Sequence, residues 1–219
     1  MPSLVGSEMC IRDRKIIDLN ELNVRNNRLN IKLVQISSEL GAGTRGASKG
    51  MSGLVNASIN KGSRVFDELD LIVVPNANDA LEDPLKFKYA KRITQLLPIF
   101  EDVSNSVRNI LSSETNFPIV LAGDHSTAVG TIAGMKAAYP DKNIGVIWID
   151  AHADIHTPYT TPSGNMHGMP IAVSLNLDHQ LSNGNEPHEE VIELWDKVKN
   201  LTNISPKLKS KDIVYIGVR

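Results

Sequence analysis

The sequence predicts an α/β protein built on a parallel sheet with helices on both faces. Two observations predict this fold class. Five short apolar runs rich in β-branched residues recur along the chain, and segments with helical periodicity lie between most of them. Strands that alternate with helices form right-handed βαβ units, which place their strands parallel in one sheet and cover it with helices.

The predicted strands are nearly continuous apolar runs, each bounded by polar residues or Gly. This pattern is typical of strands that are covered on both faces. The runs span residues 31–37, 71–75, 117–123, 144–150 and 212–217.

The predicted helices fill most of the intervals between these runs. They span residues 47–58, 86–113, 126–139, 169–175 and 189–199. The second contains Pro98, which lacks a backbone donor and clashes with the preceding turn, so we expect two helical pieces there. Turn residues without periodicity predict loops over residues 76–83, 157–168 and 177–187.

Composition excludes several classes of protein. The chain has 219 residues, with 23 Lys and Arg against 25 Asp and Glu, a charge too balanced for a polybasic nucleic-acid binder. An apolar content of 41% excludes a disordered chain, and a single Cys excludes a disulfide framework or a thiolate zinc site. Lysines recur between residues 197 and 211, where flanking acids predict a solvated face rather than a nucleic-acid interface.

The N-terminal residues 1–14, MPSLVGSEMCIRDR, fit neither periodicity. We interpret them as non-native or disordered, and we place a single partial domain over residues 15–219. The chain has no apolar run of the ~18 residues that cross a bilayer and no pattern of a signal peptide. With Cys10 as its one cysteine, we expect a cytoplasmic protein that does not enter a membrane.

Polar side chains with a spacing of two follow the fourth predicted strand. In an extended segment, alternate residues point the same way, so these carboxylates and imidazoles converge on one side. Ionised carboxylates gathered there repel one another unless a cation is present. Oxygen and imidazole ligands without a thiolate suit Mn²⁺ or another borderline divalent ion. The residues are Asp150, His152, Asp154 and His156.

A second polar group, Asp124-His125-Ser126, follows the third predicted strand. Ligands of parallel α/β sheets bind beyond the carboxyl ends of the strands, so His125 can join the same site. Asp124 is either a metal contact or a cap of the following helix. Ser126 as a nucleophile is an alternative, although the Gly pattern of a nucleophile elbow is missing.

Two glycine-containing loops complete the candidate cleft. Residues 160–168 carry hydroxyls and an amide that can hold a polar ligand head, and His167 there titrates near neutrality and can move protons. An ordinary turn-rich loop is the alternative. Residues 41–50 formally match a dinucleotide fingerprint, but Ala47 stands where a phosphate loop needs Lys, so we expect this loop to line the cleft.

These motifs together resemble the ureohydrolase family, and within it the arginases. The resemblance rests on residues 122–126 (AGDHS), 148–154 (WIDAHAD) and 163–168 (SGNMHG), and residues 212–219 match a later strand. It implies a three-layer α/β/α fold and a centre with two Mn²⁺ ions. The third motif favours arginases over agmatinases and formiminoglutamases.

The resemblance also implies a role for each site residue. His125 and Asp154 would bind the first metal, His152 the second, and Asp150 would bridge both. The α-carboxylate of L-arginine would be held in the loop, and His167 would relay a proton to the leaving amine while Asp154 holds the metal at the reacting centre. The carboxylate-binding residues would be Ser163 and Asn165, with Thr161 nearby and His156 where arginases usually have Asn.

The family pattern implies a further acidic motif and an Asp-x-Asp strand end, and neither follows within these 219 residues. We therefore expect a C-terminally truncated arginase with four of six metal ligands, without its last strands, and without turnover on its own. Alternatives are another ureohydrolase, such as an agmatinase or formiminoglutamase, or a noncatalytic binding protein with a partial metal site. Complete relatives form trimers or hexamers, so a homo-oligomer is possible.

Overall fold

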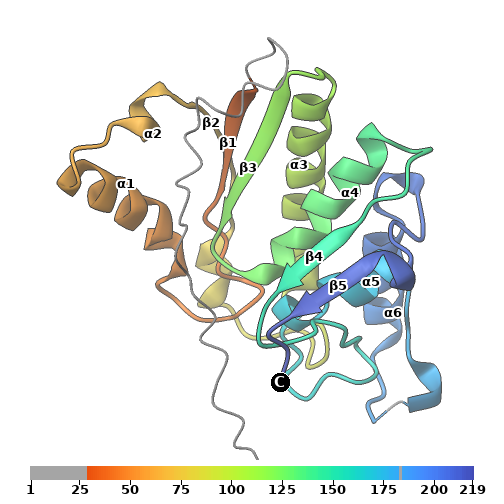
Figure 1. Cartoon of the computed structure of the whole chain (residues 1–219). Coiled ribbons are helices and arrows are strands. Elements are labelled where there is room, and N and C mark those ends of the chain that lie inside the picture. Colours follow the sequence, from red (N-terminus) through yellow and green to blue (C-terminus); the bar gives the residue numbers. More distant parts are fainter. Residues whose placement is uncertain (1–28, 183) are drawn as a thin grey trace, which may run out of the picture.

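A computed structural model describes residues 29–182 and 184–219 of the chain (Figure 1). The predicted non-native stretch, residues 1–14, lies outside the described residues. Strands and helices alternate along most of the described part, as the apolar runs predict. The strands are β1 (Asn30–Ile36), β2 (Asp70–Val74), β3 (Asn116–Ala122), β4 (Val146–Ile149) and β5 (Ile213–Ile216), and the helices are α1 (Gly50–Asn60), α2 (Val65–Glu68), α3 (Ile93–Leu111), α4 (Ala128–Ala138), α5 (Pro170–Leu175) and α6 (Glu189–Lys199).

All strand pairs of the described residues are parallel, which confirms the predicted α/β class. The strands form two hydrogen-bonded groups, one in the order β2-β1-β3 and the other pairing β4 with β5. The predicted central sheet is thus divided between β3 and β4. A cavity of about 370 Å³, lined by side chains of both strands and of α4, lies between their facing edges.

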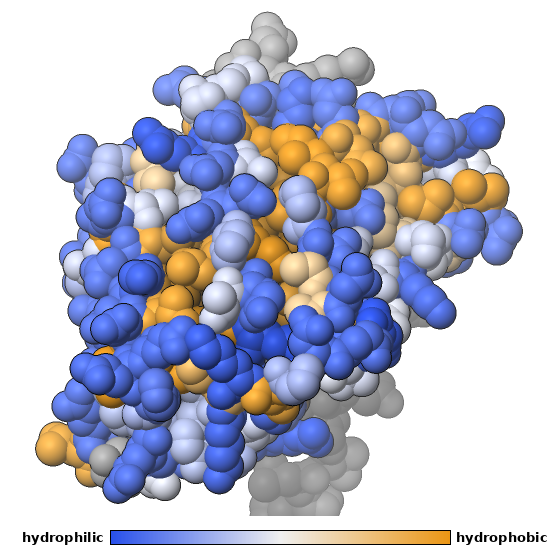
Figure 2. Space-filling view, turned by 180° about the vertical axis from the view of Figure 1, so that it is seen from behind, coloured by the Kyte–Doolittle hydropathy of each residue, from blue (hydrophilic) through white to orange (hydrophobic). Residues whose placement is uncertain are grey.

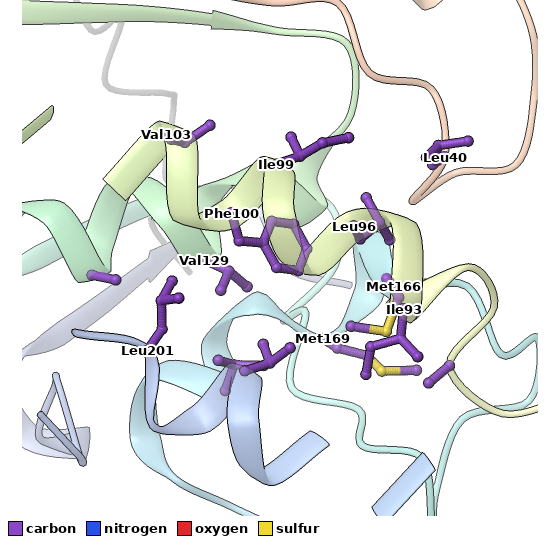
Figure 3. Packing of buried hydrophobic residues seen from close by; sticks show 14 of the residues in the cluster. Leu40, Ile93, Leu96, Ile99, Phe100, Val103, Val129, Met166, Met169 and Leu201 are labelled. Carbon is purple, nitrogen blue, oxygen red and sulfur yellow. The ribbon is translucent and has the colours of Figure 1, made fainter. Parts of the chain in front are cut away.

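The core is centred on α3, which is amphipathic and buries one face. Apolar residues at helical spacing pack there against α4, α5 and the strands (Figure 3). Each such side chain contributes roughly 1.5–3 kcal/mol when it leaves water, so this face alone can hold the helix in place. Among the described helices, none is long and apolar enough to cross a membrane. The buried apolar residues of α3 are Ile93, Leu96, Ile99, Phe100, Val103, Val107 and Ile110.

The prediction that Pro98 divides this helix is wrong. Residues 86–92 form turns and bends, and a single helix runs from Ile93 through Pro98 to Leu111. A proline inside a helix costs roughly 3 kcal/mol. Buried apolar residues on both sides of Pro98 offset this cost.

Helical cover of the strands is uneven. Figure 1 shows α3 to α6 gathered on one side of the strands, whereas α1 and α2 stand apart and bury no residue. Strand β1 is covered as predicted, but β2, β4 and β5 keep exposed apolar side chains such as Val73, Ile147 and Val214. The space-filling view accordingly shows apolar areas on the outer surface (Figure 2).

The lysines between residues 197 and 211 do not all lie on a solvated face. Lys199 and Lys207 are buried, with 4% and 3% of their surfaces exposed. The ammonium group of Lys199 pairs with the carboxylates of Asp178 and Asp196, and that of Lys207 donates a hydrogen bond to the carbonyl of Lys199. A sequence pattern of alternating charges does not reveal which of them the tertiary structure buries.

Candidate functional site

The polar residues that follow β3 and β4 meet at the carboxyl ends of these strands. The Nδ1 atom of His125 lies 2.7 Å from Oδ2 of Asp150 and 3.0 Å from Oδ2 of Asp154. His125 comes from the turn after β3, and the two carboxylates come from the segment after β4. Two strand ends that are 25 residues apart in the sequence therefore form one cluster.

Local hydrogen bonds fix the carboxylate of Asp150. Its Oδ1 accepts the backbone N–H of His152 at 2.9 Å, and its own N–H donates to the carbonyl of Ile216 in β5. The bond from His152, followed by the nearby imidazoles, holds the pKa of Asp150 below its usual value. The carboxylate is thus ionised at neutral pH and available to a cation.

The other two members of the cluster are held by their surroundings. Asp154 is buried and has a left-handed backbone with φ of 48°. Its carbonyl accepts the N–H of Ile171 at 3.0 Å, which ties it to α5. The ring of His125 stacks on Trp148 with centroids 4.5 Å apart.

Asp124 is a cap rather than a member of this cluster. Its Oδ1 accepts the N–H of Ser126 and its Oδ2 accepts the N–H of Gly41, both at 2.9 Å. The hydroxyl of Ser126 is fully buried, which argues against the alternative of a Ser nucleophile. Of the two roles predicted for Asp124, the structure favours the cap.

The cluster has the chemistry of a cation site. The close approach of the Asp154 carboxylate, followed by the charge of Asp150, raises the pKa of His125 against the effect of burial. The geometry of this approach is nevertheless not that of a hydrogen bond, and the buried Oδ2 of Asp154 has no donor among the described residues. The three potential ligand atoms lie within 4.8 Å of one another, so a divalent cation can satisfy them together.

His152, the fourth predicted ligand, stands beside this cluster. Its Nδ1 lies 3.4 Å from Oδ1 of Asp150, and 72% of its side chain is exposed. The structure therefore brings three of the four predicted metal ligands together and leaves His152 at the rim.

All nine predicted site residues line one cavity of about 520 Å³. The candidate metal ligands form one part of its lining, and the loop of residues 161–168 forms another. Val218 and Arg219, which the sequence reasoning did not select, also line it. The nine residues are His125, Asp150, His152, Asp154, His156, Thr161, Ser163, Asn165 and His167.

The loop is shaped by its own hydrogen bonds. Oγ1 of the buried Thr161 accepts the N–H of Gly164 at 2.9 Å, and the exposed Oγ of Ser163 accepts the N–H of Asn165 at 3.2 Å. The Oγ of Ser163 remains exposed to the cavity, whereas Oγ1 of Thr161 is engaged by the hydrogen bond from Gly164. Thr161 thus supports the loop from within.

Gly164 is the residue on which the loop turns. It has φ of 77°, and a Cβ atom there would lie 1.8 Å from the carbonyl oxygen of Lys88. Its own carbonyl accepts the N–H groups of Ala90 and Lys91. No other residue fits this position, because both the backbone conformation and the space require glycine.

The backbone of residues 41–42 supports the loop from a distant part of the chain. The N–H of His167 donates to the carbonyl of Gly41 at 3.2 Å, and Nδ2 of Asn165 donates to the carbonyl of Ala42 at 3.1 Å. Sequence reasoning missed these carbonyls, since main-chain acceptors leave no residue-specific signal. The Gly-rich composition of residues 41–50 was the available indication.

His156 lies at the exposed edge of the cavity. Its Nδ1 is 3.2 Å from the hydroxyl of Thr160, and its N–H donates to the carbonyl of Gly168 at 3.0 Å. The ring is thus held next to the loop, within reach of a ligand in the cavity.

Comparison with known protein families supplies the remaining observation. Residues 30–219 match the profile of the arginase family. This chain belongs to the arginase family. The match includes the strand ends and the loop that line the cavity, so the resemblance predicted from the three motifs is confirmed.

Individual arginases are similar to most of the chain. The arginase of Brevibacillus brevis is 34% identical over 196 residues, which cover 87% of this chain and 57% of that protein. A crystal structure of Bacillus subtilis arginase matches with 33% identity and a TM-score of 0.66, over 87% of this chain and 57% of that one. Entamoeba histolytica arginase in complex with L-ornithine matches with 25% identity and a TM-score of 0.66, over 88% and 59%. The chain thus spans somewhat more than half the length of these relatives.

Proposed function

We propose that this polypeptide supplies the metal-binding residues and the carboxylate-binding loop of an arginase, which hydrolyses L-arginine to L-ornithine and urea with Mn²⁺. The convergence of His125, Asp150 and Asp154 opposite the loop of residues 161–168 carries the proposal. Membership of the arginase family supports it, and so does the product L-ornithine bound in the relative from Entamoeba histolytica.

The candidate ligands fit a divalent cation, and a bound pair of Mn²⁺ ions would supply Lewis-acid activation of water at neutral pH. His125, Asp150 and Asp154 would hold one ion, and His152 would help to hold the second. The side chain of His152 is largely exposed at the rim of the cavity, beside Asp150. Asp150 would help to hold both ions, since its two oxygens face His125 and His152.

The loop would bind and orient the substrate across the cavity. Ser163, Asn165 and His156 present hydroxyl, amide and imidazole groups to the α-carboxylate, with Thr161 holding the loop in shape. Hydrolysis breaks the bond between the guanidinium carbon and Nε, and the departing amine needs a proton. His167 can relay it, because its half-buried ring lines the same cavity.

A chimera tests this proposal directly. Residues 30–219 would replace the segment of Bacillus subtilis arginase that they match, and urea release from L-arginine would be measured with Mn²⁺. We expect turnover from the chimera and none from its Asp150→Asn variant. We expect the 219-residue chain alone to bind Mn²⁺ weakly without turnover. A chimera that folds and binds Mn²⁺ but releases no urea would contradict the proposal.

His156 favours a second candidate, a ureohydrolase of different substrate choice. An imidazole can donate a hydrogen bond to a carboxylate. His156, however, lies at the exposed edge of the cavity, and its Nδ1 faces the hydroxyl of Thr160. The same chimera, offered L-arginine, agmatine and N-formimino-L-glutamate, separates the candidates. Urea release from agmatine and not from L-arginine would replace the first proposal by the second.

A further inference from the structure

The loop between β1 and α1 begins with a buried acid that the proposed chemistry does not use. Glu39 is 2% exposed, and its carboxylate lies inside the loop formed by residues 39–48. Oε1 accepts the backbone N–H of Gly46 at 2.6 Å and that of Ser48 at 2.8 Å. A buried carboxylate is costly unless it is hydrogen-bonded, so these two bonds account for its place there.

The same residue ties the loop together through its backbone. The carbonyl of Glu39 accepts the N–H of Gly43 at 2.9 Å, and its N–H donates to the side chain of Asn78. The two limbs of loop 39–48 are therefore joined at their base by one side chain. The bond from Ser48, followed by that from Gly46, holds the pKa of this carboxyl below its usual value, so it stays ionised at neutral pH.

The first limb of loop 39–48 contacts both sides of the candidate site. The N–H of Gly41 donates to Asp124, the neighbour of the metal-binding His125. The carbonyls of Gly41 and Ala42 accept from His167 and Asn165 on the substrate side. Loop 39–48 thus connects the residues next to the candidate metal ligands with the residues of loop 161–168, and a bound substrate would contact both groups.

This contact is tight. A Cβ atom at Gly41 would lie 2.3 Å from Oγ of Ser126 and 2.4 Å from Oδ1 of Asp124. The neighbouring Leu40 belongs to the core cluster that includes Leu96 and Met166 (Figure 3). Leu40 thus anchors the first limb of the loop in the core, whereas the outer limb, residues 43–47, is largely exposed. Glu39 joins the outer limb to the first limb, on which Gly41 and Ala42 lie.

We propose that Glu39 is a positioning residue of the site, whose carboxylate closes loop 39–48 so that Gly41 and Ala42 set His167 and Asn165 against the metal-binding residues. The inference rests on the proposed function for the roles of Asn165 and His167. It assigns Glu39 no contact with metal or substrate.

Binding of metal and of amino acid by the full 219-residue chain separates positioning from general stability. We expect Glu39→Ala to weaken L-arginine binding to the Mn²⁺-loaded chain about tenfold and to leave Mn²⁺ affinity within about twofold. Glu39→Gln keeps the acceptor oxygen, so it should restore most of the L-arginine affinity. The matched control is Glu82→Ala, which removes an exposed acid paired with Arg45 on the outside of the same loop. It should change neither affinity.

Hydrogen exchange supplies a readout that needs no ligand. We expect the amides of residues 163–168 to exchange about tenfold faster in Glu39→Ala than in the parent chain, and at the parent rate in Glu82→Ala. If the parent chain fails to bind L-arginine, the proposed function is in doubt, and exchange still decides the role of Glu39. Unchanged exchange at residues 163–168 in Glu39→Ala, or an equal loss of Mn²⁺ and L-arginine affinity, would overturn the inference.

Discussion

The two sides of the candidate cavity are built in different ways. On the metal side, His125, Asp150 and Asp154 contact one another through their side chains, and charge draws them together. On the loop side, Asn165 and His167 are placed by main-chain carbonyls of Gly41 and Ala42. The first arrangement depends on which side chains are present, and the second depends on the path of the backbone. Substitutions should therefore affect the two sides through different properties.

The largest effect is expected on the metal side. Asp150→Asn removes the charge of the carboxylate that faces both His125 and His152. Mn²⁺ affinity should fall by at least a thousandfold, which corresponds to about 4 kcal/mol. Isothermal titration of the arginase chimera with Mn²⁺ measures this, and Asp141→Asn, which changes an exposed acid after α4, is the control. Comparable binding in the Asp150→Asn chimera and in the parent chimera would show that Mn²⁺ binding does not depend on this charge.

The loop side should respond to backbone geometry. Gly164→Ala places a Cβ atom 1.8 Å from the carbonyl of Lys88 at a φ of 77°. The free energy of unfolding should drop by about 3–4 kcal/mol from strain and overpacking. Urea denaturation checks this against Gly168→Ala, where a Cβ atom meets nothing within 4 Å. Equal losses in both variants would mean that the loop is not held as described.

A buried titratable group lies near α5, the helix that follows the loop. Burial lowers the pKa of Lys207 to about 8, and the backbone N–H of the same residue donates to the carbonyl of Ser174 in α5. Between pH 8 and about 10.5 the unfolded chain binds the proton that the folded chain has lost, so stability should rise with pH by on the order of 3 kcal/mol. Denaturant titrations at pH 7.5 and 10 should show this rise in the parent chain. Lys207→Met should abolish it.

The smallest effect is expected outside the cavity. Arg45 and Glu82 form an ion pair whose side chains are 51% and 74% exposed. Water screens such exposed pairs, so they contribute little to stability. Arg45→Ala should therefore leave both the midpoint of urea denaturation and the Mn²⁺ affinity unchanged. A clear shift of the midpoint to lower urea would show that the ion pair also holds loop 39–48.

The same contrast explains what could be predicted from the sequence. The strands and the convergence of Asp150 and Asp154 could be predicted from local patterns. Continuous apolar runs indicate the strands, and polar residues at every second position indicate side chains on one side. The capping role of Asp124 was one of two alternatives, and only its hydrogen bonds in the folded structure distinguish them. The carbonyls of Gly41 and Ala42 could not be predicted, since every residue has a carbonyl.

Other differences have the same origin. The burial of Lys199 and Lys207 and the continuity of α3 through Pro98 depend on neighbours that are distant in the sequence. Local propensity alone predicts that the two lysines are exposed to solvent and that the helix breaks at Pro98. Tertiary packing overrides these preferences when enough apolar surface is buried around the residue.

The division of the strands into two groups has a mechanical consequence. His125 extends from the end of β3, whereas Asp150 and Asp154 extend from the end of β4, and among the described residues no ladder joins these strands. A cation held by the three side chains would therefore link the two groups of strands. Its binding would stabilise the junction between them, and chelation would weaken that junction before it weakened either group of strands.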